Sequence, residues 1–151
     1  MGARLRALAI AVGLGAAGCT VYDSGPTSPG GYPRVEGRWT IDAWVVSSTC
    51  GFVSDERFTA WAVQNRDLLQ LSIDVSGFGE IRYDGWVDPD GDFLVSQRTI
   101  YPHSAIRDDS EVDGRFSFNG RSMSATEVEW ITDLVTGDSC RITWEWEGDR
   151  F

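Results

Sequence analysis

Residues 140–147, CRITWEWE, alternate apolar and polar side chains more cleanly than any other stretch of this chain. Ile142, Trp144 and Trp146 occupy every second position, and charged or hydroxyl side chains stand between them. Successive side chains of a β-strand point to opposite faces, so this pattern predicts a strand with one buried face. No window of the sequence keeps a helical period over three turns.

The same period of two recurs upstream, and turn signals separate the segments. The expected strands are residues 37–47, 57–64, 68–75, 80–87, 93–101, 111–118 and 121–134. Turn residues stand between several of them, as NRD at 65–67, DPDGD at 88–92, NG at 119–120 and TGD at 136–138. Residues 102–110 are expected to form a longer loop. The alternation stumbles at residues 127–129, which predicts a β-bulge, with Glu127 and Glu129 sharing one solvated face.

Eight short strands joined by short hairpins predict an all-β fold, a small eight-stranded antiparallel up-and-down β-barrel over residues 35–151. Closing such a barrel brings the end of the first strand beside the start of the last one. Cys50 follows the first strand and Cys140 begins the last, so a disulfide between them fits closure in an oxidising compartment. A two-sheet sandwich, which could also bring these cysteines together, and two buried free thiols are the alternatives.

Gly37-Arg38-Trp39, near the start of the first strand, resembles the G-x-W motif of the calycin superfamily, which includes the lipocalins. The resemblance implies a lipocalin-like barrel in which Trp39 closes the floor and packs against an arginine from the end of the last strand. Arg150 is the arginine at that place. The alternative is that Trp39 is simply a core aromatic residue.

The face expected to point inward carries large apolar side chains. They are Trp39, Ile41, Leu69, Leu71, Ile73, Tyr83, Phe116, Phe118, Met123, Trp144 and Trp146. These could fill the barrel, or leave a small pocket near its open mouth. The aromatic load and the calycin resemblance lead us to expect a small hydrophobic ligand. The residues expected to bind it are Trp39, Tyr83, Phe116 and Trp144. If Trp44, Trp61 and Trp86 cluster on the outer surface, they would form a patch for a partner.

The N-terminus reads as an export signal, with Arg4 and Arg6 before an apolar core too short to span a bilayer. Residues 16–19, AAGC, resemble the lipobox of bacterial lipoproteins, which implies cleavage before Cys19 and acylation of that cysteine. Residues 1–18 are then expected to be a lipoprotein signal peptide. The alternative is an ordinary signal peptide that is cut near Ala17 and leaves Cys19 as a free thiol. Residues 19–34 are rich in Gly, Pro and Ser and are expected to be a flexible linker. By the same resemblance, Thr20 favours the outer membrane, so we expect a lipid-anchored protein of the cell envelope.

The charge of the chain limits its partners. Cleavage before Cys19 removes two of 13 arginines, which leaves 11 against 23 acidic residues and a net charge of −12. This balance argues against nucleic acid and against anionic lipid headgroups, so acyl chains are the expected membrane contact. No catalytic motif surrounds the single His103, and the cysteines lack metal-ligand spacing. We therefore expect neither an enzyme nor a cofactor. The expected function is a binding module, and the alternative is an envelope structural or interaction protein with a filled core.

Overall fold

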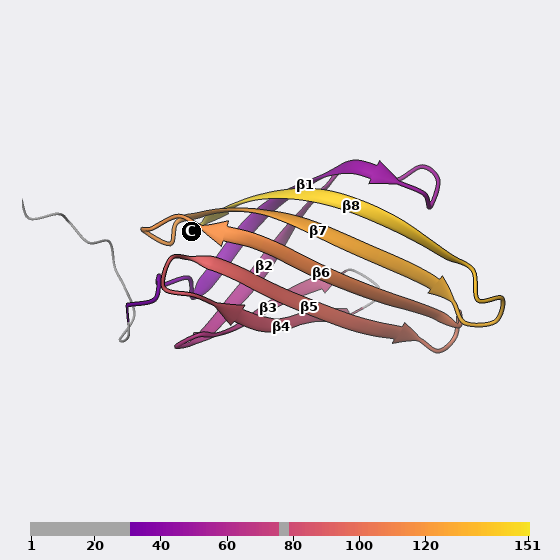
Figure 1. Ribbon diagram of the computed structural model, residues 1–151, viewed down its shortest axis with the longest axis horizontal. Helices are drawn as coiled ribbons and strands as arrows, with labels where there is room; N and C mark the ends of the chain where they lie inside the picture. The colour runs from indigo at the N-terminus through magenta and orange to yellow at the C-terminus, as the bar shows by residue number, and fades with distance from the viewer. Residues whose placement is uncertain (1–30, 76–78) are drawn as a thin grey trace, which may run out of the picture.

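The computed structural model of the chain describes residues 31–75 and 79–151. They form eight strands (Figure 1), and the predicted leader, Cys19 and most of the linker lie outside the described residues. The strands are β1 (Gly37–Ser48), β2 (Glu56–Asn65), β3 (Leu68–Val75), β4 (Gly79–Val87), β5 (Asp92–Tyr101), β6 (Ile106–Phe116), β7 (Ser122–Asp133) and β8 (Ser139–Arg150). The described part of the chain contains no helix long and apolar enough to cross a membrane.

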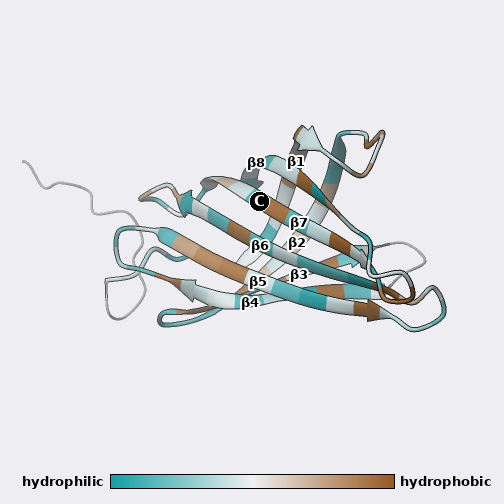
Figure 2. Ribbon diagram, turned by 45° about the vertical axis from the view of Figure 1, so that its right-hand side comes forward, coloured by the Kyte–Doolittle hydropathy of each residue, from teal (hydrophilic) through white to brown (hydrophobic). Residues whose placement is uncertain are grey.

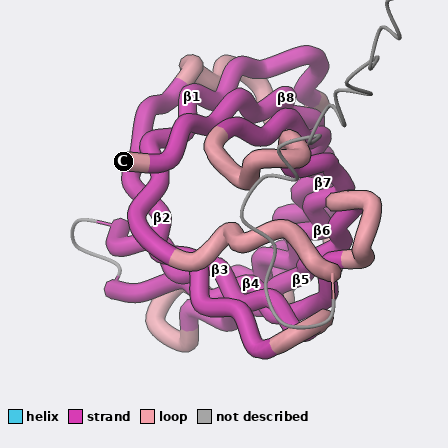
Figure 3. Tube along the Cα trace, turned by 90° about the vertical axis from the view of Figure 1, so that its left-hand side faces the viewer, coloured by secondary structure: helices cyan, strands magenta, loops and turns pink. Residues whose placement is uncertain are grey.

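The eight strands close into one antiparallel barrel. Each strand pairs with the next along the chain, and β1 pairs with β8, from Trp39 opposite Arg150 to Ser48 opposite Ile142. The view along the long axis shows the resulting ring (Figure 3). The predicted eight-stranded up-and-down barrel is therefore confirmed, and a two-sheet sandwich is excluded.

A disulfide joins Cys50 to Cys140 where β1 and β8 close the barrel. Cys50 follows β1, and Cys140 is the second residue of β8, so the bond links the two strands that are farthest apart in sequence. This pairing confirms the expectation from the sequence. The bond lies at the end of the barrel opposite to the one where residues 31–36 lead into β1, as follows from the β1–β8 register.

Period-two alternation sets which side chains fill the barrel. In β8 the buried positions are Ile142, Trp144, Trp146 and Gly148, and polar residues alternate with them on the outside. Figure 2 shows the hydropathy changing repeatedly along the strands instead of dividing the molecule into two halves. Every residue that the sequence assigned to the inner face is buried except Phe118.

One end of the barrel is filled by aromatic side chains, and we call this end the floor. Trp39 is 1% exposed, and its Nε1 donates a hydrogen bond of 2.9 Å to the carbonyl oxygen of Val35. Its ring centroid lies 5.3 Å from that of Phe116, which in turn lies 4.5 Å from that of Phe93. Arg150 stands directly opposite Trp39 in the β1–β8 register, at the place expected from the G-x-W resemblance.

The Arg150 guanidinium fixes the segment that leads into the barrel. Its Nη1 donates to the carbonyl oxygens of Arg34, at 2.5 Å, and Glu36, at 3.2 Å. The backbone of Gly37, between this segment and Trp39, has a φ of +123°, which glycine adopts far more readily than other residues. The described part of the linker is therefore held against the floor.

Three sequence expectations need correction. β6 begins at Ile106, not at residue 111, because Tyr101 already pairs with Ile106 and residues 102–105 make the turn. Phe118 is 64% exposed, since the bond from Ser117 N to Ser122 O closes the hairpin and leaves Phe118 in the turn.

The expected bulge at residues 127–129 is also wrong. β7 keeps a continuous register with both β6 and β8, and the register shift lies in β1, between Val45 and Ser47. The alternation of β7 stumbles for another reason, which is that acidic side chains occupy positions on its inner face.

Candidate ligand-binding cavity

A cavity of about 350 Å³ occupies the half of the barrel opposite the floor and is partly open to solvent. Its volume falls within the range of small-molecule sites. Side chains from seven of the eight strands line it. They are Ala43, Glu56, Phe58, Ile73, Asp74, Ile81, Tyr83, Asp108, Glu127, Glu129, Trp144 and Trp146.

Aromatic rings form a large part of the apolar lining. The ring of Trp146 meets that of Phe58 edge-on at 5.3 Å between centroids, and that of Tyr83 edge-on at 6.0 Å. Trp144, two positions earlier in β8, presents a second indole to the same space. Such edge-on contacts stabilise aromatic pairs and hold the rings in fixed orientations.

Glu127 is buried in this lining, and the expectation that it is solvated is wrong. Its side chain is 6% exposed, and Oε1 accepts a hydrogen bond of 2.9 Å from the Tyr83 hydroxyl. Burial, together with the nearby charge of Glu129, raises the pKa of Glu127 to about 8, although hydrogen bonds from Tyr83 and Ser110 oppose the rise. Glu127 is therefore mostly protonated at neutral pH.

Glu129 occupies the next inward position of β7, closer to the mouth. Its Oε2 accepts a hydrogen bond of 3.0 Å from Trp144 Nε1, which fixes that indole in the cavity wall. Burial raises the pKa of Glu129 to about 6; the bond from Trp144 lowers it, and the charges of Asp108 and Glu56 add to the rise. At neutral pH Glu129 is therefore mostly ionised.

Asp108 approaches from β6, diagonal to Glu129, since the β6 residue paired with Glu129 is Ser110. Burial is the main cause that raises the pKa of Asp108, hydrogen bonds from Gln97 and Ser110 oppose the rise, and the charge of Asp109 adds to it. One carboxyl oxygen of Asp108 is buried and receives no hydrogen bond from the described residues. The indole N–H of Trp146 is also buried, and it finds no acceptor among them. The cavity lining thus contains both an acceptor and a donor that protein groups do not satisfy.

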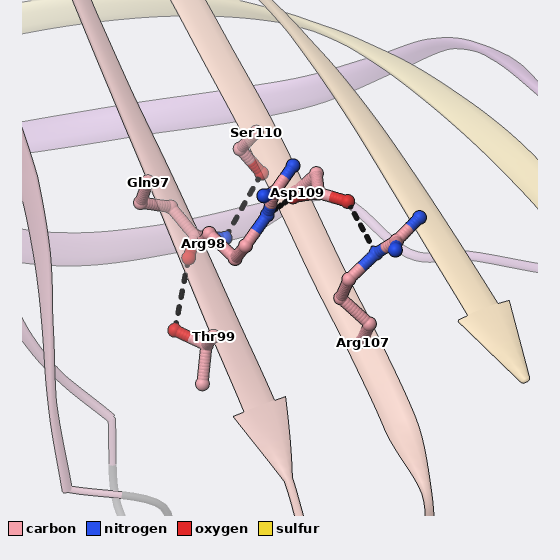
Figure 4. A network of polar contacts seen from close by, with 6 residues as sticks. All are labelled: Gln97, Arg98, Thr99, Arg107, Asp109 and Ser110. Carbon is pink, nitrogen blue, oxygen red and sulfur yellow. Dashed lines mark hydrogen bonds and ion pairs between the residues drawn. The ribbon is translucent and has the colours of Figure 1, made fainter. Parts of the chain in front are cut away.

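Two arginines of β5 and β6 form ion pairs on the outer side of the barrel. Figure 4 shows Arg98 and Arg107 both directed to Asp109, which lies on the outer side of β6. The Arg107 Nε atom lies 2.7 Å from Asp109 Oδ2. Gln97 and Ser110 point inward and contact each other at 3.4 Å. Arg98 and Arg107 alternate with buried Gln97 and with Asp108 along their strands, so they pair with Asp109 on the outer side and not with the carboxyls of the cavity.

The residues expected to bind a ligand fall into two groups. Tyr83 and Trp144 line the cavity, whereas Trp39 and Phe116 pack together in the floor, away from it. Sequence reasoning missed Asp108, Glu127 and Glu129 as lining residues. The signal was present, because Glu127 and Glu129 have the same parity along β7 as buried Met123 and Ala125.

The acidic groups are not arranged as a metal centre. Nowhere in residues 31–75 and 79–151 do three His, Cys, Asp or Glu side chains come together so that they could hold a metal ion. Comparison with protein-family models and with curated proteins finds no match to this chain.

Proposed function

We propose that this chain is an exported, lipid-anchored protein of the cell envelope, on the outer membrane, whose barrel binds one small molecule with an apolar body. The observation that carries the proposal is the contrast between the two halves of the barrel. Aromatic rings fill the floor, whereas a cavity of about 350 Å³ remains at the other end, walled by Phe58, Tyr83, Trp144 and Trp146.

The direction of the barrel is consistent with this role. Residues 31–36 meet the barrel at the floor, where Arg150 binds the carbonyl oxygens of Arg34 and Glu36. The cavity lies at the opposite end. An anchor at Cys19 would therefore join the barrel at the end opposite the mouth, which leaves the mouth unobstructed by the attachment point.

Filling the cavity tests the binding proposal. Ala43 lines it and is buried, so Ala43→Phe should place a ring in the space and abolish binding of a neutral hydrophobic dye, N-phenyl-1-naphthylamine. Thr126→Phe adds the same ring on the outer face of β7 and should leave the titration unchanged. Circular dichroism checks that both variants fold. Wild-type protein that does not enhance the fluorescence of the dye, or an Ala43→Phe variant that binds it normally, would contradict the proposal.

The anchor is tested separately in the native membrane. Wild-type protein should sediment with the outer membrane, and mass spectrometry should find acyl chains on an N-terminal peptide that begins at Cys19. Cys19→Ala should show neither property. A wild-type protein that is released without acyl chains would support the ordinary signal peptide and overturn the anchor.

A role in protein interaction is the second candidate, and an outer surface favours it. Trp61 and Trp86 are 58% and 45% exposed, and Val63 and Leu68 lie between them on β2 and β3. We call these four residues the outer apolar patch. If this surface binds a partner, Trp61→Ser with Trp86→Ser should remove a crosslinked species from the native membrane and leave dye binding intact.

A further inference from the structure

The cavity carries negative charge without a matching cation. Five of its lining residues are acidic, namely Glu56, Asp74, Asp108, Glu127 and Glu129, and none of the lining residues is basic. Among the described residues, the arginines that form ion pairs bind other acids, all outside this lining. Glu56 and Asp74 are exposed and Glu127 is mostly protonated at neutral pH, so the charge withdrawn from water belongs to Glu129 and Asp108. A carboxylate in such a place without a counter-charge is costly, so the site lacks a cation.

Its polar groups are also incompletely satisfied. Asp108 contributes one buried carboxyl oxygen, Oδ1, that receives no hydrogen bond from the described residues, although hydrogen bonds from Gln97 and Ser110 reach its carboxylate. Glu129 accepts from Trp144, and Glu127 accepts from Tyr83, but both donors are neutral. An occupant that brings a positive charge and N–H donors would supply the missing counter-charge and the donor that the Asp108 oxygen lacks, and the Trp146 N–H would stay without an acceptor.

The aromatic walls narrow the kind of cation. Trp144 and Trp146 border the same space as the carboxyls, and indole rings attract ammonium groups through cation–π interactions while also contacting apolar groups. The described residues hold no cluster of acidic, His or Cys side chains that could hold a metal ion. This combination fits an organic cation better than an inorganic one.

We propose that the ligand of this cavity is an organic amine that binds in its protonated form. Its ammonium group lies beside Glu127 and Glu129, in the negative field of Asp108. Its apolar body packs against Trp144, Trp146 and Phe58. The inference rests on the proposed function, since it names the chemical class of the molecule that the same cavity binds.

Three probes of one shape test the charge requirement. These are 2-phenylethylamine, its neutral isostere propylbenzene, and the anion 3-phenylpropanoate. Binding is followed by the tryptophan fluorescence of the whole chain, excited where the phenyl probes do not absorb. We expect the amine to bind at least about tenfold more tightly than propylbenzene, because charge-assisted hydrogen bonds are stronger than contacts to a neutral group of the same shape. The anion should bind most weakly.

Conservative variants locate the charge. The double variant Glu127→Gln with Glu129→Gln removes both negative charges and keeps oxygen acceptors for Tyr83 and Trp144. It should therefore lose the preference for the amine and still bind propylbenzene. Glu147→Gln, on the exposed outer face of β8, is the matched control and should bind the amine like the wild type.

The pH dependence of the affinity for 2-phenylethylamine tests the role of the two glutamates independently. The amine stays protonated from pH 5 to 8, so changes in affinity report on the protein. Asp108 on β6, Glu56 on β2 and Tyr83 on β4 line the cavity with the two glutamates, and none of them is a cation. Asp74 on β3 also borders the cavity, but it is exposed and alternates with buried Ile73. Affinity for the amine should therefore rise across this range as Glu129 and then Glu127 ionise.

The outcomes separate the two proposals. Equal affinity for the amine and propylbenzene, or an affinity for the amine that does not change with pH, would overturn the amine inference and leave the binding function standing. Tighter binding of the anion would do the same. If neither the probes nor the neutral dye bind, both the amine inference and the binding function fail.

Discussion

Replacing Glu127 by glutamine should stabilise the folded protein at neutral and alkaline pH. Glu127 is 6% exposed, and the pKa of its carboxyl rises from 4.5 to about 8 in the folded protein, chiefly because of burial. A raised pKa means that the folded state holds its proton more tightly than the unfolded state. The contribution of Glu127 to the unfolding free energy is therefore fully present below pH 4.5, and it declines as the pH rises from 4.5 to 8.

The size of the effect follows from the two pKa values. Each pKa unit corresponds to about 1.36 kcal/mol, so the rise from 4.5 to about 8 costs about 5 kcal/mol of unfolding free energy above pH 8. At pH 7 the cost is about 3 kcal/mol, because the unfolded state has already released this proton while the folded state still holds it. The remaining cost appears only between pH 7 and pH 8 and above, where the folded-state carboxyl ionises. Glu127→Gln has no titrating group, and its amide oxygen can still accept the bond from Tyr83.

Urea unfolding at pH 4.5, 7 and 9, followed by tryptophan fluorescence, measures the effect. We expect wild type and Glu127→Gln to be similar at pH 4.5, and the variant to be about 3 kcal/mol more stable at pH 7. That difference moves the urea midpoint by roughly 1–3 M. Glu129, whose pKa rises from 4.5 to about 6, leaves a residual loss of about 2 kcal/mol in the variant.

The exposed Glu147→Gln serves as the control and should follow the wild type at every pH. A wild-type stability that stays constant from pH 5 to 8 would refute the reasoning. So would a Glu127→Gln variant that is less stable than the wild type at pH 7, because the buried carboxyl would then contribute to stability instead of opposing it.

Three further predictions concern the fold. Replacing Cys50 and Cys140 together by alanine should lower the unfolding free energy by about 4–5 kcal/mol in the chain-entropy model, given a sequence separation of 90 residues, as denaturant titration would show. Trp39→Ala should cost about 3–5 kcal/mol, because it removes a fully buried ring from the floor, and differential scanning calorimetry would detect the lower Tm. Gly114→Ala should cost about 2–3 kcal/mol in urea titration, because its new Cβ would stand 2.4 Å from the Cβ of Ala125; an unchanged midpoint would contradict the close approach of β6 and β7.

The strands and their closure could be predicted because they rest on local signals. The residues 140–147 that indicated a buried strand lie in β8, and residues 68–75 were predicted with the bounds that β3 has in the structure. Side-chain alternation and turn residues act over a few positions of the chain, so a single sequence contains them. The pairing of Cys50 with Cys140 followed because an up-and-down barrel leaves one place where the first and last strands meet.

The division of the barrel into a filled floor and an open cavity could not be predicted in this way. Trp39 and Trp144 look alike in sequence, yet one packs against Phe116 in the floor and the other borders the cavity. Which ring leaves space depends on how side chains from strands distant in sequence meet inside the barrel. No periodicity along one strand contains that information.

The sequence by itself determined the succession of strands, most of the inner face, and the place where the two cysteines meet if the barrel closes. Only the tertiary structure decided the chemistry of the interior. Glu127 and Glu129 looked like an irregularity in an outer face until β4, β6 and β8 enclosed them with Tyr83, Asp108 and Trp144. Alternation is a property of one strand, whereas the burial and the pKa of a carboxyl depend on every neighbour that displaces water around it.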